Sequence, residues 1–224
     1  MKVLAITHGP DVGPELLGDV VADAGHELVL WDIAARGRPP GGADAVMVLG
    51  GGQNVGEELE HPWLEDEYDL LREWVERGTP LLCVCLGAQT LAHAVGAEVG
   101  PAPERYAGFY ETDLTQTGIA DPVLGALPDR FDALNANAYA FAVPPAGIRL
   151  ARAGRLEQAF RVGERAWGVQ FHPEVRRDQV IRWFEEEERL PRPLEQVTAE
   201  VDAGIERWQE LGRRLGRAFL AAAS

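Results

Sequence analysis

The sequence predicts an α/β fold with a doubly wound, mostly parallel sheet and helices on both of its faces. Two observations lead to this prediction. Apolar runs that are too short for a helix alternate, along the first half of the chain, with segments whose apolar residues recur at helical spacing. Strands that alternate with helices form parallel sheets, and the loops that carry chemistry then gather at the carboxyl ends of the strands.

The chain begins with two predicted strands joined by a helix. Lys2 to Thr7 is apolar enough for a buried strand, and Glu27 to Trp31 is the next one. Between them, Pro14 opens a helix that Gly25 ends, because proline suits the first helical turn and glycine the position after the last. The apolar face of this helix consists of Leu16, Leu17, Val20, Val21 and Ala24.

A third strand, a helix and a fourth strand follow. Ala45 to Leu49 is a fully apolar run that ends in the glycines Gly50 to Gly52. Pro62 to Arg77 is predicted as a helix from the spacing of Leu64, Tyr68, Leu71 and Val75. Pro80 to Val84 is again a buried strand, and the residues after Cys85 suit a helix. Parallel strands end at the same edge of a sheet, so we expect Gly50 to Gly52 beside Cys85.

From Ala97 to about Arg165 the pattern changes to short alternating strands with turns. The clearest strands are residues 111–115 and 148–151, and Asp121 to Leu124 is a turn that leads into a short helix. These strands are expected to extend the sheet or to form an antiparallel flap.

The end of the chain is predicted to be helical. A helix from Asp178 to Arg189 is broken by Pro191 and Pro193, and a long amphipathic helix follows, with an apolar stripe of Leu194, Val197, Val201, Ile205, Trp208, Leu211, Leu215 and Phe219. Such a stripe usually packs on its own domain, and a partner helix or a dimer is the alternative. We therefore assign residues 1–190 to one domain and 191–224 to a helix packed on it.

Composition narrows the class of protein. With 224 residues, 46% of them hydrophobic, the chain can bury a core without disulfides or a structural metal. Its two cysteines are too close in sequence to brace a fold and lack the partners of a zinc site. The net charge of −15 disfavours nucleic acids and anionic membranes as partners. Because neither a signal peptide nor a membrane-spanning segment is visible, we expect a soluble, cytoplasmic protein.

The corner at Cys85 is the first candidate site. A cysteine between a strand and a helix stands clear of the sheet edge, and the first backbone N–H groups of the helix have no intrahelical acceptors. The helix end favours negative charge, and thus a thiolate and an oxyanion. Gly87 lets the chain turn there without a Cβ clash. The alternative is that Cys85 is a small buried hydrophobic residue.

A second candidate site lies far downstream, at Ala166 to Glu174. An alternating strand delivers His172 at its end, and Pro173 stops the strand so that Glu174 can turn back toward the imidazole. A thiol nucleophile needs a base, and the base needs an orienting carboxylate. Cys85, His172 and Glu174 are therefore candidates for a catalytic triad.

Together the two segments resemble the class I, or triad-type, glutamine amidotransferases. The segment from Cys83 to Gln89 resembles the family pattern Gly-Ile-Cys-x-Gly-x-Gln, with Cys83 in place of its glycine, and Gly168 to Glu174 matches Gly-x-Gln-x-His-Pro-Glu in full. The resemblance implies a flavodoxin-like fold and release of ammonia from glutamine through a γ-glutamyl thioester. Cys85 would be the nucleophile, and no cofactor is implied.

The resemblance also implies roles for residues around the nucleophile. The amides of Gly52 and Leu86 would form the oxyanion hole, although Gln53 stands where the family usually has proline. A flexible glycine turn is the alternative for that loop. Gln89 lies one turn into the helix after Cys85, and its amide would contact the substrate; a plain helix-surface glutamine is the alternative.

The largest departure from the family pattern lies near the substrate pocket. Many free-standing relatives carry Trp-His-x-Asp there, whereas Asn137 and Tyr139 fall at the histidine and aspartate positions of this chain. The substrate could therefore be glutamine or another γ-glutamyl compound. The rest of the sequence offers no nucleotide-binding P-loop, so an ammonia acceptor would be activated by a separate synthase; a non-catalytic binding protein is the third alternative.

The remaining histidines and the second cysteine are predicted to lie outside the chemistry. Cys83 would be buried in the core, and His93 is too far along the helix to be the base for Cys85. His8, His26 and His61 are interpreted as surface or capping residues, and the run from Glu185 to Glu188 as a solvated helix face.

Overall fold

A computed structural model describes residues 1–9 and 12–224, and its described strands form one nine-stranded sheet of order β2-β1-β3-β4-β9-β8-β7-β5-β6. The first five strands of this order are parallel: β1 (Lys2–Thr7), β2 (Glu27–Asp32), β3 (Ala45–Val48), β4 (Leu81–Val84) and β9 (Ala166–Val169). With β9 as the fifth strand, this part has the flavodoxin-like order. Their carboxyl ends lie at one edge, where Cys85 follows β4.

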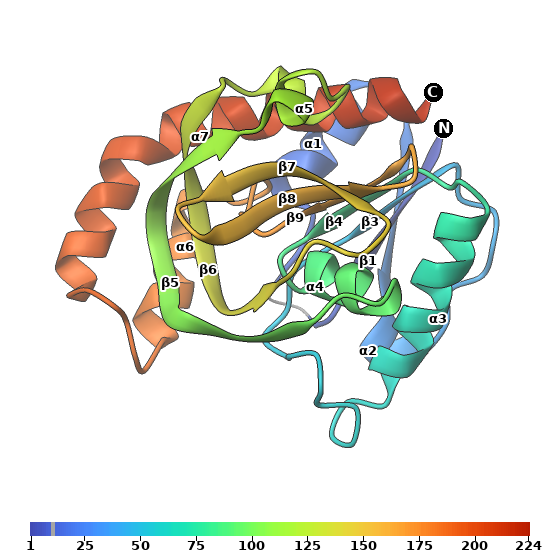
Figure 1. The fold of residues 1–224 in the computed structure, drawn as a ribbon, viewed down its shortest axis with the longest axis horizontal. Coiled ribbons are helices and arrows are strands. Elements are labelled where there is room, and N and C mark those ends of the chain that lie inside the picture. The colour runs from blue at the N-terminus through green and yellow to red at the C-terminus, as the bar shows by residue number, and fades with distance from the viewer. Residues whose placement is uncertain (10–11) are drawn as a thin grey trace.

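The other half of the sheet is antiparallel and curls away from the parallel half (Figure 1). It consists of β5 (Val99–Leu114), β6 (Arg130–Phe141), β7 (Gly147–Ala153) and β8 (Leu156–Val162). β5 and β6 form a long hairpin whose register shifts between Pro101 and Tyr106. These strands extend the sheet, one of the two expectations for this region.

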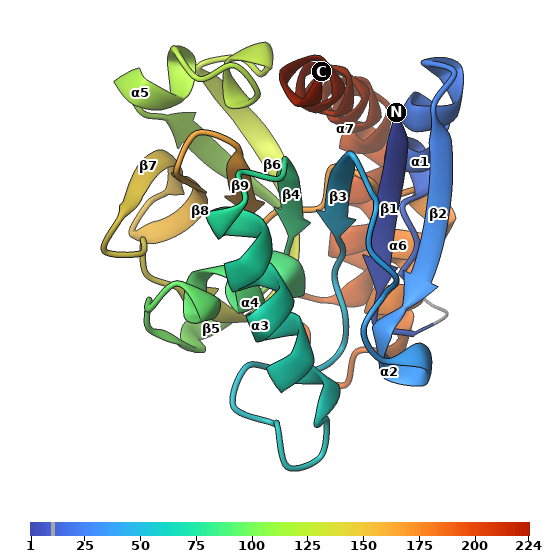
Figure 2. The same ribbon diagram turned by 90° about the vertical axis from the view of Figure 1, so that its right-hand side faces the viewer.

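Helices cover both faces of the parallel half because its strands alternate their side chains. In β4, for example, Leu82 and Val84 face α1 (Glu15–Asp23), α6 (Arg177–Glu186) and α7 (Leu194–Ala223), whereas Leu81 and Cys83 face α3 (Trp63–Glu76) and α4 (Leu86–Ala94). Figure 1 separates the two helical layers, and Figure 2 views the sheet from the α3 side. The short helices are α2 (Ile33–Arg36), α5 (Gln116–Ile119) and the 3₁₀ turn at Leu124–Ala126.

The long C-terminal helix α7 packs along α1 and β5 through its apolar stripe. Val197, Val201, Trp208, Leu215 and Phe219 are each 2% exposed or less. Fully burying one such side chain stabilises a fold by about 1.5–3 kcal/mol relative to leaving it in water. Apart from Leu194, which is 38% exposed, the stripe is thus covered by this chain's own elements.

The α/β fold, with its parallel core, two helical layers and C-terminal helix, confirms the expected fold class. The observed boundaries lie within a few residues of the expected ones; α6, for instance, ends at Glu186 rather than Arg189. The helix α2 and the length of the β5–β6 hairpin were not expected, since neither has a periodic apolar pattern of its own. No helix within the described residues is long and apolar enough to cross a membrane.

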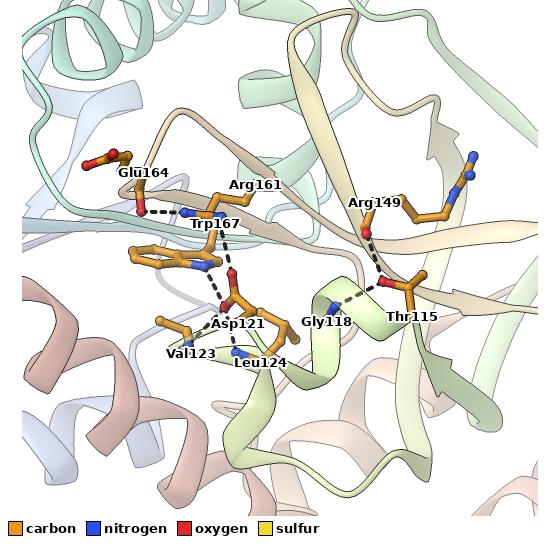
Figure 3. A network of polar contacts seen from close by, with 9 residues as sticks. All are labelled: Thr115, Gly118, Asp121, Val123, Leu124, Arg149, Arg161, Glu164 and Trp167. Atoms are coloured by element: carbon orange, nitrogen blue, oxygen red, sulfur yellow. Dashed lines mark hydrogen bonds and ion pairs between the residues drawn. The ribbon is translucent and has the colours of Figure 1, made fainter.

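A buried carboxylate ties the antiparallel half to the parallel half (Figure 3). Asp121 Oδ1 accepts hydrogen bonds from Trp167 Nε1 in β9 at 2.9 Å and from the amides of Val123 and Leu124 at 2.9 and 3.0 Å. Its Oδ2 is 3.1 Å from Arg161 Nε in β8, and Arg161 also donates to the carbonyl of Glu164. Asp121 therefore joins the turn before the 3₁₀ helix to two strands.

Asp121→Ala is expected to lower the free energy of unfolding by about 3 kcal/mol, because it leaves buried N–H groups and the Arg161 guanidinium without their acceptor. Urea denaturation measures this loss. Asp113→Ala is the matched control, since Asp113 pairs with Arg130 where both side chains are more than half exposed. An exposed ion pair of this kind contributes little to the free energy of unfolding. Equal losses in the two variants would contradict the role of Asp121.

Candidate functional site

A cavity of about 380 Å³ opens at the carboxyl edge of the parallel strands. Its lining joins five parts of the chain: Val12 before α1, the glycine loop after β3, the start of α4, the β5–β6 hairpin and the β9–α6 region. Among the lining residues are the predicted site residues Gly52, Cys85, Gln89, Asn137, Tyr139 and His172. The structure thus brings together residues that are far apart in the sequence.

Cys85 occupies a strained corner between β4 and α4, with φ 51° and ψ −108°. Positive φ is rare for a residue other than glycine, and it is typical of residues held in place for function. The corner is tight because α4 starts against β3: a Cβ on Gly87 would lie 2.3 Å from the carbonyl oxygen of Val48. Glycine is therefore required at position 87, and Cys85 is presented to the cavity at the first turn of α4.

His172 and Glu174 form a buried pair in the turn after β9, which ends at Val169 rather than at His172 as expected. His172 Nδ1 is 2.7 Å from Glu174 Oε1, and the two residues are 3% and 0% exposed. Because a carboxylate oxygen accepts, this contact places a proton on Nδ1 and directs Nε2 away from Glu174. Among the described residues, Nε2 has no hydrogen-bond partner.

The imidazole lies next to the Cys85 thiol. A Cβ on Gly50 would lie 3.1 Å from His172 Cε1 and 3.6 Å from Cys85 Cβ, so Gly50 touches both side chains. Burial alone would lower the pKa of His172, but the charge of Glu174 and the Cys85 sulfur outweigh it and raise this pKa to about 10. The site therefore favours a charged imidazole beside the sulfur.

The backbone of His172 is held from two sides. Its amide donates to the carbonyl of Leu134 in β6 at 2.9 Å, and Trp208 Nε1 in α7 donates to the His172 carbonyl at 2.8 Å. A Cβ on Gly212 would come within 2.0 Å of the Pro173 carbonyl oxygen, so α7 lies directly against this turn. The C-terminal helix thus supports the histidine although it carries none of the motif residues.

A chain of amide side chains runs from the cavity wall to Cys85. Asn137 Nδ2 donates to the Tyr139 carbonyl at 2.9 Å, and Gln89 Nε2 donates to the same carbonyl at 3.1 Å and to Gln170 Oε1 at 3.2 Å. Gln170 Nε2 in turn lies 3.6 Å from Cys85 Sγ. Gln89 is 3% exposed and is therefore not a plain surface glutamine.

The glycine loop lies beside the nucleophile candidate. A Cβ on Gly51 would meet the Leu86 side chain at 2.8 Å, whereas a Cβ on Gly52 would have open space around it. Gly51 and Gly52 both line the cavity. Leu86 is the first residue of α4, where a backbone amide has no intrahelical acceptor. The structure thus brings the glycine loop to the start of α4, beside Cys85, as the sequence predicted.

Sequence reasoning missed several residues in or beside the cavity. Gln170 contacts both Gln89 and Cys85, and its signal was its place in the quoted motif, two residues before His172. Arg105 and Glu187 form an ion pair at the cavity and carried no sequence signal. The run from Glu185 to Glu188 is therefore not wholly a solvated face, since Glu187 lines the cavity.

The interpretation of His8 as a surface or capping residue is wrong. His8 is 5% exposed, and its imidazole contacts Glu67 of α3. The helical spacing of α3 places Glu67 near the buried face, but the partner could not be identified without the fold. Cys83 is fully buried, as expected, and burial followed by the charge of Glu67 raises its pKa well above the usual range. No cluster of His, Cys, Asp or Glu within residues 1–9 and 12–224 could hold a metal ion.

The raised pKa of His172 predicts a pH-dependent stability. The imidazole stays protonated in the folded chain up to about pH 10, compared with an ordinary pKa of 6.5. Its contribution is thus fully present below pH 6.5 and is lost as pH rises to about 10, by at most about 1.4 kcal/mol per pH unit. Urea unfolding of the wild type and His172→Gln across this range measures the loss. If the difference in free energy of unfolding between the wild type and His172→Gln does not shrink as the pH rises, the predicted pH dependence is contradicted.

Comparison with known proteins identifies the family. Residues 20–181, which include Cys85, His172 and Glu174, match the family described as glutamine amidotransferase class-I. A glutamine-hydrolyzing GMP synthase of Thermomicrobium roseum is 37% identical over 113 residues, 50% of this chain and 21% of that protein. A glutamine-hydrolyzing GMP synthase subunit of Haloquadratum walsbyi is 30% identical over 132 residues, 58% of this chain and 65% of that protein. The chain thus spans less than two thirds of these relatives.

Solved structures agree with this match. A glutamine amidotransferase from Thermotoga maritima has a TM-score of 0.85 and 26% identity, with 98% of each chain covered. A glutamine amidotransferase from Methylobacillus flagellatus has the same fold, with a TM-score of 0.87 at 20% identity, over 99% of this chain and 94% of that one. The family match covers well over half of the sequence and includes Cys85, His172 and Glu174. This chain therefore belongs to the class I glutamine amidotransferase family.

Proposed function

We propose that this chain hydrolyses the side-chain amide of glutamine, with Cys85 as nucleophile, His172 as general base and acid, and Glu174 as the carboxylate that orients His172. One observation carries the proposal. At the wall of a cavity, the His172 and Cys85 side chains lie against the same glycine, Gly50, and interact electrostatically. His172 Nδ1 contacts Glu174, and among the described residues its Nε2 has no hydrogen-bond partner. That arrangement is what a thiol nucleophile requires.

The first half of the reaction would form a thioester. Because the site favours a charged imidazole, His172 Nε2 would hold the Cys85 proton before the attack, and the sulfur, as a thiolate, attacks the amide carbon of glutamine. The amides of Leu86 and of the glycine loop, with Gly52 as the predicted donor, stabilise the tetrahedral oxyanion. His172 then gives its proton to the departing nitrogen, which leaves as ammonia when the C–N bond breaks.

The second half would return the enzyme to its starting state. Water, deprotonated by His172, attacks the γ-glutamyl thioester, and the C–S bond breaks to release glutamate. The sulfur leaves as a thiolate and recovers its proton from His172. Throughout, Glu174 accepts the Nδ1–H bond and stabilises the imidazolium, but it transfers no proton itself.

The amide chain through Gln89, Asn137 and Tyr139 would form the substrate-binding wall. Gln89 and Asn137 both donate to the Tyr139 carbonyl, and this shared bond fixes the β6 backbone beside Cys85. The buried Oδ1 of Asn137 has no partner among the described residues and is free to accept an N–H of the substrate.

Two substrate classes fit this site. Glutamine with ammonia transfer to a separate synthase is favoured by the relatives, one of which is named as one subunit of a GMP synthase. A self-sufficient hydrolase of γ-glutamyl peptides or amides is favoured by Asn137 and Tyr139, which replace a charged pair of the family pattern at the cavity wall.

An assay of the purified chain tests both classes. With glutamine as substrate, the release of ammonia and glutamate is measured. With γ-glutamyl peptides, the release of glutamate and of the remaining peptide is measured. Each substrate is tested with and without added synthase. Turnover of glutamine that rises with a synthase supports the first class, and turnover of peptides by the chain alone supports the second. The absence of turnover under all four conditions would refute the proposed hydrolysis.

A further inference from the structure

A buried pair of ionisable residues lies behind the glycine loop and outside the machinery described so far. His8 follows β1, and Glu67 lies on the inward face of α3; both side chains are fully buried. His8 Nε2 is 2.6 Å from Glu67 Oε2, and the imidazole stacks on Trp63 with 5.0 Å between ring centroids. Burying such a pair is costly unless every hydrogen-bonding position has a partner.

The second nitrogen of His8 supplies the link to the site. Its Nδ1 is 2.8 Å from the carbonyl oxygen of Gly50. A carbonyl oxygen only accepts, so Nδ1 must carry a proton. The proton between Nε2 and Glu67 resides on one of these two groups, and the pair is neutral as a whole in either case. Glu67 outweighs the opposing effect of burial and raises the pKa of His8.

The carbonyl that His8 binds belongs to the loop beside the nucleophile. Gly50 touches the His172 ring and Cys85, and a Cβ on Gly51 would lie 3.0 Å from His8 Cβ and 2.8 Å from the Leu86 side chain. In a trans peptide the N–H points opposite to the C=O. The bond from His8 therefore sets the direction of the Gly50–Gly51 peptide, and with it the direction of the Gly51 N–H.

We propose that His8 and Glu67 are positioning residues that hold the Gly50–Gly52 loop with its amides directed at the oxyanion. The inference rests on the hydrolysis proposed above and assigns that reaction two further residues. A glycine loop is otherwise free to adopt many backbone conformations, and each donor that is misaligned with the oxyanion costs rate. The bond to Gly50 restricts the loop from behind, without contact to the substrate.

Stability alone does not account for the pair. Apolar side chains of similar size are often as stabilising as a buried ion pair, or more so. The bond that an apolar replacement could not reproduce is the one from Nδ1 to Gly50. The imidazole binds Gly50 through Nδ1 and Glu67 through Nε2. These two interactions can be separated by mutation, because the two nitrogens lie at different distances from the backbone.

His8→Asn and His8→Gln form a matched pair of variants. The asparagine amide reaches the position of Nδ1 and can donate to Gly50, whereas the glutamine amide reaches the position of Nε2 and can pair only with Glu67. Both lose the stack on Trp63. We expect kcat for glutamine to fall about 10- to 100-fold in His8→Gln and by about threefold or less in His8→Asn, with little change in KM.

Two further measurements separate positioning from general damage. Alkylation of Cys85 by iodoacetamide needs no oxyanion hole and should proceed at the wild-type rate in both variants. Amide hydrogen exchange at Gly51 and Gly52, followed by NMR, should be about tenfold faster in His8→Gln only. His61→Asn and His61→Gln are controls, because His61 also contacts Trp63.

The outcomes are distinguishable. If kcat and loop exchange are the same in His8→Asn and His8→Gln, the positioning role is overturned, even if both variants are less stable. If His8→Asn is the more impaired of the two, it is overturned as well. If the wild type hydrolyses no substrate but loop exchange still separates the two variants, the proposed function fails and the positioning of the loop stands.

Discussion

Replacing Cys85 with alanine is expected to reduce ammonia release from glutamine to the uncatalysed background, because no thioester can form without the sulfur. The fold should be unaffected. Alanine at a φ of 51° is no more strained than cysteine, and Cys85 sits at the cavity wall, where the loss of a sulfur leaves no closed void. Steady-state kinetics and a thermal unfolding curve of the same preparation measure the two effects.

Cys83→Ala is the matched control, since it also removes a cysteine thiol, only two residues from Cys85. Cys83 points into the core between β4 and the α3–α4 layer, and its raised pKa keeps it a neutral thiol. It should retain most of the activity. Mass spectrometry after treatment with a glutamine-like electrophile should find the label on Cys85, and a label confined to Cys83 would overturn the assignment.

The second large effect is expected at the His172–Glu174 pair. His172→Ala removes the base and should lower kcat by about 10²- to 10⁴-fold, the usual range for acid–base assistance. Glu174→Gln should lower kcat by no more than this, because the amide still accepts from Nδ1–H but no longer stabilises the imidazolium. Glu174 acts only through His172, so the double variant should be no slower than His172→Ala alone.

Paired kinetics on the two single variants and the double variant check this prediction. Asp178→Asn, an exposed carboxylate near the same turn, serves as the control and should be without effect. Unchanged turnover in Glu174→Gln would mean that another carboxylate orients His172. Additive losses in the double variant would mean that Glu174 has a role of its own.

Much of the fold could be predicted because its signals are local. The apolar runs of β1, β3 and β4 and the amphipathic periods of α1, α3 and α7 each lie in one continuous segment. Alternation of such segments specifies a parallel sheet. The β5–β6 hairpin was harder to predict, because its strands are long and half-exposed and their pairing is irregular between Pro101 and Tyr106. Its pairing depends on contacts between distant segments, which carry no periodic signal.

The candidate triad could also be predicted, because motif and chemistry coincide in short segments. Cys85 stands before Gly87, which only glycine can occupy, and His172 and Glu174 are two residues apart on a turn made by Pro173. Gln89 followed from its spacing on α4. The residues that complete the cavity, such as Arg105 and Glu187, come from other elements, and no local pattern marks them.

By itself, the sequence determined the α/β class, the corner that carries Cys85, and the order in which nucleophile and base occur along the chain. These features follow from apolar period, from glycine and proline positions, and from side-chain chemistry, all of which act over a few residues. Only the tertiary structure decided that His8 is buried against Glu67 and Gly50, and that Trp208 of α7 holds the His172 carbonyl. These contacts join residues 36 to 59 positions apart, and packing alone brings them together.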